Sequence, residues 1–205
     1  MSIISNYIWE NAADGGTNPV SLVLQQVKVR GREIALFGVC HSPEEREASL
    51  TEQLTEWFHR ICLPACESRA APAPWELLEP ELRRLCGELP WREPWGYCAA
   101  MLVGNAFCLF GRGDVTAQLI NYRYNRPRMK RLETPLYGRI QRGAGLLLHT
   151  PELTGNLLRE EVCQILHGKG LDQEEGIGRR LREMYREGRS RGNRGAVGGI
   201  YLQVL

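Results

Sequence analysis

Apolar and polar positions follow two different periods along the chain, and the change from one to the other predicts strands and helices. Residues 34–40 form a nearly unbroken apolar run, which is typical of a strand buried on both faces. After it the apolar positions recur at helical spacing, at Leu50, Leu54, Trp57, Phe58 and Ile61. Ser42 is the expected N-cap and Pro43 the first residue of this helix. A strand, a sharp turn and a helix are therefore predicted between residues 33 and 61.

The same two periods predict the remaining elements. We expect further strands at residues 3–9, 20–30, 96–103, 106–111, 115–122, 136–141, 144–149 and 197–205. We expect further helices at residues 75–89, 156–167 and 174–187. Turn sequences predict a hairpin around residues 30–32, an antiparallel meander of the three strands between residues 96 and 122, and a strand pair around residues 142–143. Residues 123–131 are basic and polar, and no strand is predicted there.

The order of these elements defines a fold class. Strands alternate with pairs of helices, and the strands are joined mostly by hairpin connections. This order predicts an α+β fold with antiparallel sheets and helices on their outer faces. A chain of 205 residues, 43% of them hydrophobic, can bury one substantial core, so we expect a single domain.

Targeting signals and cysteine usage indicate the compartment. The first residues lack a basic region followed by an apolar segment, and no apolar run approaches the roughly 18 residues of a membrane span. Several of the seven cysteines sit in apolar runs, where reduced thiols behave as small hydrophobes, so we expect a cytoplasmic protein. Cys62 and Cys66 form the one close pair and lack a second pair or a nearby His, which argues against a zinc site.

Charge is divided unevenly along the chain. Residues 1–115 carry ten basic and fifteen acidic side chains, and residues 116–205 carry sixteen and nine. This asymmetry is typical of a polyanion-binding face, or of two halves of one domain that attract each other. Seven arginines between residues 179 and 194 could bind nucleic acid, but they alternate with Glu183 and Glu187. A solvated helix face is the favoured interpretation, and nucleic acid is not the expected partner.

Two histidines end predicted buried strands, and each has a functional and a structural interpretation. His41, between Cys40 and Ser42, and His149 could lie close together and form a zinc or nucleophile site. No third ligand is evident in the sequence. We therefore expect His149 to be a hydrogen-bonded residue at the edge of the core and His41 to fill space at the end of its strand.

Four stretches, taken in order, resemble the metal-dependent (type 2C) serine/threonine protein phosphatases in their bacterial form. They are Leu36–Ser42, Ala99–Ala117, Gly143–Leu153 and Arg191–Ile200, which are similar to the family's Asp-Gly strand, its Gly-Asp-Ser-Arg turn, its Ser-Asp-Gly stretch and its closing Asp-Asn strand. The resemblance spans nearly the whole chain. It implies a four-layer sandwich in which two central antiparallel sheets are flanked by pairs of helices, as one domain over residues 1–205.

The same resemblance implies that the family's metal site is degenerate here. In that family, acidic side chains hold two divalent cations that activate a water for attack on phosphorus. The matching positions of this sequence are Gly15, Val20, His41, Ser42, Pro151 and Gly195. Of the segment matched to residues 15–20, only Asn18 agrees with the family. Magnesium and manganese need several oxygen ligands, so we expect no metal, no other cofactor and no catalytic residue at these positions.

We therefore expect a catalytically inactive, phosphatase-like binding or regulatory module rather than an enzyme. Its expected partner is a protein that carries phosphate, with no membrane involved. Arg191 and Arg194 are candidate anion-binding residues, because the matching loop faces the family's metal pocket and guanidinium groups bind phosphate; the alternative is that both point into solvent. The alternative functions are a divergent phosphoprotein hydrolase that uses His41 or His149, and a basic-surface nucleic-acid-binding protein.

Overall fold

The computed structural model describes residues 2–14, 19–41, 48–67, 80, 96–123, 126–167 and 173–205. The strands in these residues are β1 (Ile3–Glu10), β2 (Val20–Val29), β3 (Arg32–His41), β4 (Gly96–Val103), β5 (Ala106–Arg112), β6 (Thr116–Arg123), β7 (Arg126–Leu132), β8 (Leu136–Arg139), β9 (Gly145–His149) and β10 (Val197–Val204). The helices are α1 (Ala48–Trp57), a π-helical turn (Phe58–Cys62), α2 (Leu63–Glu67), α4 (Pro151–Thr154), α5 (Arg159–Ile165) and α6 (Glu174–Ser190).

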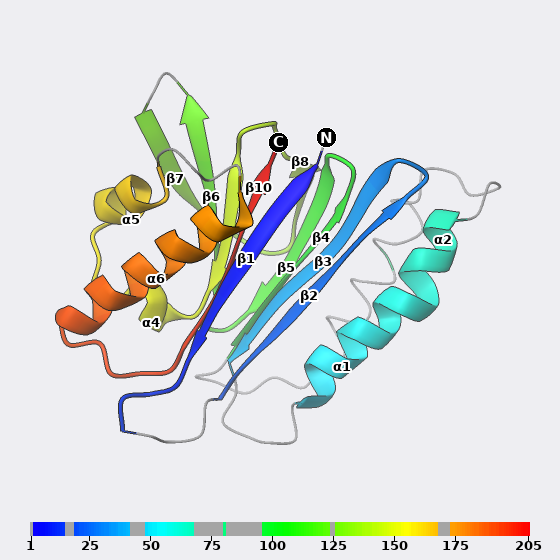
Figure 1. Ribbon diagram of the computed structural model, residues 1–205. Coiled ribbons are helices and arrows are strands. Elements are labelled where there is room, and N and C mark those ends of the chain that lie inside the picture. The colour runs from blue at the N-terminus through cyan, green and yellow to red at the C-terminus, as the bar shows by residue number, and fades with distance from the viewer. Residues whose placement is uncertain are drawn as a thin grey trace.

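The strands form two five-stranded antiparallel sheets that pack face to face (Figure 1). The first sheet has the order β1-β10-β9-β6-β7 and the second has the order β2-β3-β4-β5-β8. Both sheets contribute to the core between them, for example Phe37 and Ala100 from the second and Leu146 and Ile200 from the first. These strands are apolar on both faces because each sheet is also covered by helices.

The helices cover the outer faces of the two sheets (Figure 1). Ile177, Leu181 and Met184 recur at helical spacing on α6 and pack with Leu147 and Tyr201 of the first sheet. On the second sheet, Leu54, Trp57 and Phe58 pack with Leu36 and Met101, among others. The predicted α+β sandwich of two antiparallel sheets is therefore confirmed for the described residues.

Several element predictions are confirmed and others are wrong. The strands β1 to β5 and β10, the hairpin of β2 with β3 and the long helix α6 lie where the sequence pattern placed them. The predicted meander is wrong in its third strand, because β6 pairs with β7 and β9 in the other sheet instead of with β5. The predicted pair of β8 with β9 is also wrong, since β8 pairs with β5 and β9 with β6 and β10.

Two stretches expected to lack an element contain one. The basic stretch forms the edge strand β7, in which Met129 and Leu132 are buried and the exposed side chains are basic. The short helix α4, with Pro151 as its first residue, lies between the predicted strand at 144–149 and the predicted helix at 156–167, where no element was expected. Most of the helix predicted at residues 75–89, and the predicted cap at Ser42 and Pro43, fall outside the described residues.

None of the helices in the described residues combines the length and the hydropathy that a bilayer span requires.

Candidate functional site

The antiparallel register brings the matched positions to one end of the sandwich, which we call the pocket end. Val20 and His41 are direct partners in the pairing of β2 with β3. Val20 also lies against Gly198 of β10, and the Gly198 amide donates a hydrogen bond to Thr150 Oγ1 over 3.2 Å. Thr150 is the residue before Pro151. Residues far apart in sequence therefore meet at this end, as the resemblance implies, while Gly15 and Ser42 fall outside the described residues.

Val20 closes one corner of the pocket end with apolar surface. Its side chain is 4% exposed, and a Cβ added to Gly198 would overlap Val20 Cγ1. The Val20 carbonyl accepts a hydrogen bond from the indole Nε1 of Trp9 over 2.7 Å. The contact with Gly198 leaves no room there even for a methyl group on β10. This corner is packed like a core and its side chain supplies no oxygen to a metal.

His41 forms an ion-pair-like contact across the pocket end. Its Nδ1 donates to Asp114 Oδ2 over 2.9 Å, because a carboxylate oxygen accepts. Asp114 follows Gly113, which has a φ of 79°, in the turn between β5 and β6. A Cβ on Gly96 would lie 2.6 Å from the Asp114 amide nitrogen, so this turn packs directly on β4. The close backbone contact fixes Asp114 beside a histidine that is 7% exposed.

The corner formed by Pro151 and Gly195 is also filled. An added Cβ on Gly195 would lie 2.5 Å from Glu152 Cγ. The Gly195 amide donates to Asn193 Oδ1 over 3.1 Å, and the Asn193 side-chain amide donates to the Glu152 carbonyl. The loop before β10 is therefore tied to the start of α4. The Glu152 side chain occupies the space that a side chain at position 195 would need.

His149 is an almost completely buried titratable group of the pocket end, with 2% exposure. Its Nδ1 lies 2.7 Å from the Thr150 carbonyl oxygen, which can only accept, so Nδ1 carries the proton. In the neutral ring Nε2 then accepts from Thr116 Oγ1 over 3.0 Å. Burial lowers the pKa of His149 to about 4, although the hydrogen bond to the carbonyl acts in the opposite direction.

Thr116, His149 and the Thr150 carbonyl are arranged in the order of a hydroxyl nucleophile, a base and an acceptor that orients the base. A base is most effective when its pKa lies near the working pH, and the low pKa of His149 opposes proton uptake at neutral pH. The arrangement therefore acts as a buried hydrogen-bond chain that joins β6, β9 and α4. This is the structural role expected for His149 from its place at the end of a buried strand.

A polar cavity of about 580 Å³ opens beside this chain of hydrogen bonds. Thr116 lines it together with Arg112 and Arg131, and Glu133 supplies one acidic side chain. The charge of Arg131 contributes to the lowered pKa of His149. The cavity combines two guanidinium groups with hydroxyl groups, and this chemistry suits an anion better than a cation.

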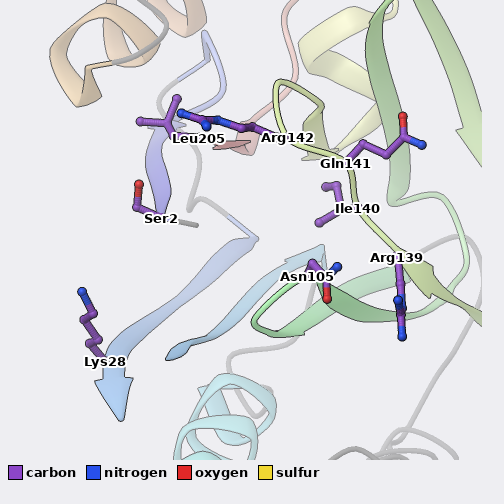
Figure 2. A pocket seen from close by; sticks show the side chains of 8 residues that line it. All are labelled: Ser2, Lys28, Asn105, Arg139, Ile140, Gln141, Arg142 and Leu205. Atoms are coloured by element: carbon purple, nitrogen blue, oxygen red, sulfur yellow. The ribbon is translucent and has the colours of Figure 1, made fainter. Parts of the chain in front are cut away.

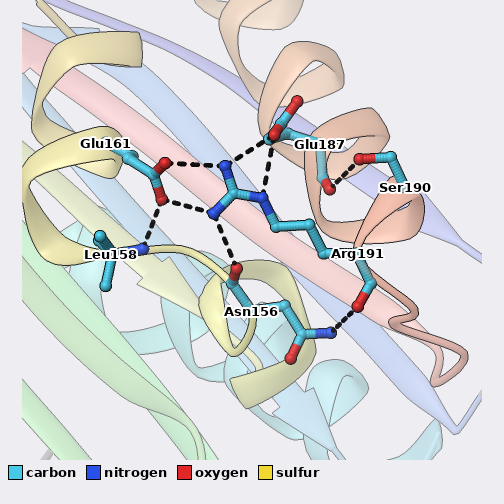
Figure 3. Close-up of polar contacts among 6 residues, drawn as sticks. All are labelled: Asn156, Leu158, Glu161, Glu187, Ser190 and Arg191. Atoms are coloured by element: carbon cyan, nitrogen blue, oxygen red, sulfur yellow. Dashed lines mark hydrogen bonds and ion pairs between the residues drawn. The ribbon is translucent and has the colours of Figure 1, made fainter.

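Arg191 and Arg194 differ in their surroundings. Figure 3 shows the guanidinium of Arg191 between Glu161 of α5 and Glu187 of α6. These ion pairs connect the end of α6 to the start of α5. Both terminal nitrogens of Arg191 donate to Glu161 over 2.7 Å, and its Nε and one terminal nitrogen donate to Glu187 over 3.0 and 2.8 Å. The anions that Arg191 contacts thus belong to this chain. Arg194 is exposed, and its carbonyl accepts from the Ala13 amide.

Among the residues that the structure describes, the side chains of the pocket end do not form a ligand set for a pair of divalent cations. Asp114 and Glu152 each have one buried carboxylate oxygen with no hydrogen-bond partner in the structure. Within the described ranges, however, no three His, Cys, Asp or Glu side chains are grouped so that they could hold a metal ion. Two separate carboxylates fall short of the oxygen ligands that magnesium or manganese requires.

Two face-to-face antiparallel sheets with helices outside form the four-layer sandwich that the resemblance to type 2C phosphatases implies. No protein-family model and no curated protein matches the chain by sequence. Solved structures match over the full length of this chain. They include the serine/threonine phosphatase Stp1 from Staphylococcus aureus, with 11% identity, a TM-score of 0.71 and 96% of that chain covered.

Two further solved structures show the same likeness. The serine/threonine phosphatase of S. agalactiae is 10% identical with a TM-score of 0.65, and all of both chains is covered. PppA from Pseudomonas aeruginosa, described as a key regulatory component of the T6SS, is 11% identical with a TM-score of 0.64, and 99% of that chain is covered. At this identity the likeness shows a common fold, which is the fold that the sequence resemblance implies.

Proposed function

We propose that this chain is a catalytically inactive protein of the phosphatase fold that acts as a binding or regulatory module. The observation that carries the proposal is the filling of the pocket end. The matched positions that the structure describes are Val20, His41, Pro151 and Gly195. Val20 and Gly195 are packed against neighbouring chain, His41 is bonded to Asp114, and Pro151 begins a helix. In the part of the chain that the structure describes, these corners offer no set of oxygen ligands for the metal-bound water that the family's mechanism requires, and this supports the proposal.

The first test is a manganese-dependent hydrolysis assay with p-nitrophenyl phosphate. We expect no turnover that follows the protein peak on a sizing column and that a chelator abolishes. Turnover with both properties would overturn the proposal. A sharper form of the test introduces single carboxylates at His41 or Gly195. Neither His41→Asp nor Gly195→Asp should create activity, because one carboxylate does not complete a two-metal site. In Gly195→Asp the new side chain would also collide with Glu152.

The proposed partner is a protein that presents a phosphorylated residue to the cavity beside Thr116. Arg131 is exposed, and in the described part of the chain no carboxylate forms an ion pair with it. It is therefore better placed to take an external anion than Arg191, which is bound to Glu161 and Glu187. Arg194, which is exposed, is retained as a second candidate.

Titration of a phosphoserine peptide, with the unphosphorylated peptide as reference, tests this partner class. We expect Arg131→Gln to weaken binding about tenfold, the effect of losing one charge-assisted contact. The double variant Arg191→Ala, Arg194→Ala measures the contribution of the loop before β10. Equal binding of both peptides to the wild type would mean that the protein does not recognise phosphate and that a partner binds at another surface.

A divergent hydrolase is the second candidate, and the contact between Thr116 and His149 is the observation that favours it. This alternative predicts turnover that is lost in Thr116→Val and in His149→Ala. Thr116→Val keeps the shape of the side chain and removes the hydroxyl, so it separates chemistry from packing. Activity that survives Thr116→Val would exclude this nucleophile.

A further inference from the structure

The end of the sandwich opposite the pocket end carries a second, larger opening, which we call the groove end. Its volume is about 870 Å³. It is lined by Ser2, Lys28, Asn105, Arg139, Ile140, Gln141, Arg142 and Leu205. β2 runs from Val20 at the pocket end to Val29 at the groove end, ten residues that span roughly 30 Å. The two openings are therefore separate features of the molecule.

The side-chain charges of the groove have one sign. Lys28, Arg139 and Arg142 come from the end of β2, the end of β8 and the turn between β8 and β9. Figure 2 shows them around the opening, with Asn105 and Ile140 between them. All three cations are exposed, and no Asp or Glu occurs among the described lining residues. The three cationic side chains favour an anion over a cation as the ligand of the groove.

The backbone that carries the two arginines is held in place. Ile140, between Arg139 and Gln141, is 4% exposed, and its amide donates to the Asn105 carbonyl over 2.9 Å. Beyond Arg142, the Gly143 amide donates to the Val204 carbonyl over 2.7 Å, and Gly143 has a φ of 81°. Both arginines thus project from a segment that is tied to β10 and to the turn between β4 and β5. A fixed backbone lowers the entropy cost of binding.

The size and chemistry of the groove favour a peptide. Its volume far exceeds that of one inorganic ion, and its cations come from three elements, so a ligand must carry several negative charges. The described lining contains no aromatic side chain, which would be needed to stack nucleic-acid bases. Asn105 offers an amide group that can pair with a peptide backbone, and Ile140 gives an apolar floor.

We propose that the groove end binds an acidic, carboxylate-rich segment of a partner polypeptide. The two guanidinium groups can each take a carboxylate in a bidentate manner, and Lys28 adds a point charge at the far side of the groove. This surface is independent of the proposed inactivity of the pocket end, since it lies at the other end of the strands.

The test uses a fluorescent decapeptide of alternating Glu and Gly, with a Gln and Gly decapeptide of the same length as reference. We expect the acidic peptide to bind and the neutral one not to bind. The triple variant Lys28→Gln, Arg139→Gln, Arg142→Gln should bind the acidic peptide at least about tenfold more weakly. Binding should also weaken between about 0.05 and 0.5 M salt, as expected for exposed charges.

A matched control separates a groove from a general effect of net charge. The variant Arg179→Gln, Arg182→Gln, Arg186→Gln removes the same number of exposed charges from α6. It should bind the acidic peptide within about twofold of the wild type. Equal losses in both variants, or no binding by the wild type, would overturn the proposal. A labelled oligothymidylate that binds more tightly than the peptide, and that the groove variant loses, would also overturn it in favour of nucleic acid.

Discussion

The two ends of the sandwich are built from the same strands but differ in what fills them. At the pocket end, Val20 meets Gly198, and His41 and His149 are almost completely buried. At the groove end, Lys28 and Arg142 stand exposed around an open space. The strands alone therefore do not decide which end binds a ligand. The side chains at the strand ends differ: at the pocket end they fill the corners at Val20 and Gly195 and leave a polar cavity beside Thr116.

This difference predicts that substitutions of the buried residues at the pocket end act on stability and that substitutions of the exposed cations at the groove end act on binding. Buried groups lose packing and hydrogen bonds when they are replaced, and the free-energy cost is large. Exposed cations are solvated by water and contribute little to the free energy of unfolding, so the cost of replacing them is small. The predictions below test this contrast, beginning with the residues that are packed most tightly.

Gly198→Ala should have the largest effect on stability. The added methyl group would overlap Val20 Cγ1, and β1 and β9 on either side of β10 limit how far the Gly198 backbone can move. We expect a loss of about 3 kcal/mol in the free energy of unfolding, as is typical of overpacked cores. Urea denaturation measures it.

The second half of this test is the double variant Gly198→Ala, Val20→Ala. Val20→Ala alone should destabilise by about 2 kcal/mol, because it leaves a cavity. In the double variant the two changes compensate each other, so the total loss should be smaller than the sum by at least about 1 kcal/mol. Additive losses would mean that Val20 and Gly198 do not contact each other in solution.

His149 should make the stability of the protein depend on pH. Its folded pKa of about 4 lies below the ordinary 6.5 of an unfolded chain, so the unfolded state takes up the proton first as the pH falls. The stabilisation is complete above pH 6.5 and is lost progressively towards pH 4. At pH 5 the linkage amounts to about 2 kcal/mol.

Chemical denaturation of wild type and His149→Gln between pH 7.5 and 5 measures this dependence. The variant should be less stable at pH 7.5, because it disrupts the contacts with Thr116 and the Thr150 carbonyl, and its stability should vary less with pH. His59→Gln, at an exposed position, is the control and should follow the wild type. An unchanged pH slope in His149→Gln would contradict a neutral, buried ring.

The sequence predicted the elements that have a clear local period and missed the choices that depend on distant partners. Apolar alternation located β1, β2, β3 and β10 closely. The turn before β6 has residues that are typical of a hairpin, but the chain crosses there to the other sheet, where β6 pairs with β9. The same turn residues can thus form a hairpin or a crossing between sheets. β7 was missed because only Met129 and Leu132 are buried in a strand of otherwise mostly basic residues.

The site could be predicted only in part. The resemblance placed Val20 and His41 at one end of the fold, and the register of β2 with β3 makes them neighbours. The bond from His41 to Asp114 joins residues 73 positions apart, and no local pattern indicates it. The carboxylates around Arg191 could not be foreseen either, because Glu161 lies on another helix and helical spacing relates Arg191 only to Glu187.

The Arg191 cluster should have a moderate effect that depends on salt. Its guanidinium bridges α5 and α6, and it holds the pKa of Glu161 at about 2, below the ordinary 4.5. The depressed pKa means that the stabilisation is present above pH 4.5 and is lost as the pH falls through 2. Arg191→Gln should lower the thermal midpoint at low salt, and less so at high salt, because these charges are partly solvated.

A matched variant separates the bridge from the neighbouring pair on α6. Glu161→Gln removes the contact between helices, and Glu183→Gln removes the exposed pair with Arg180 within one helix. Differential scanning calorimetry should show a larger decrease of the midpoint for Glu161→Gln. Equal midpoints for the two variants would mean that the bridge in Figure 3 adds nothing beyond an ordinary surface pair.

The smallest effect on stability is expected at the groove end. Lys28→Gln, Arg139→Gln and Arg142→Gln together should change the free energy of unfolding by no more than about 0.5 kcal/mol, because all three side chains are exposed. Relief of repulsion between like charges should make the change slightly stabilising at low salt. Ile140→Ala, at the buried floor of the same groove, is the contrasting variant and should cost at least about 2 kcal/mol. If the triple variant instead proves as destabilising as Ile140→Ala in urea denaturation, the cations support the fold, and the contrast between buried pocket-end residues and exposed groove-end cations is wrong.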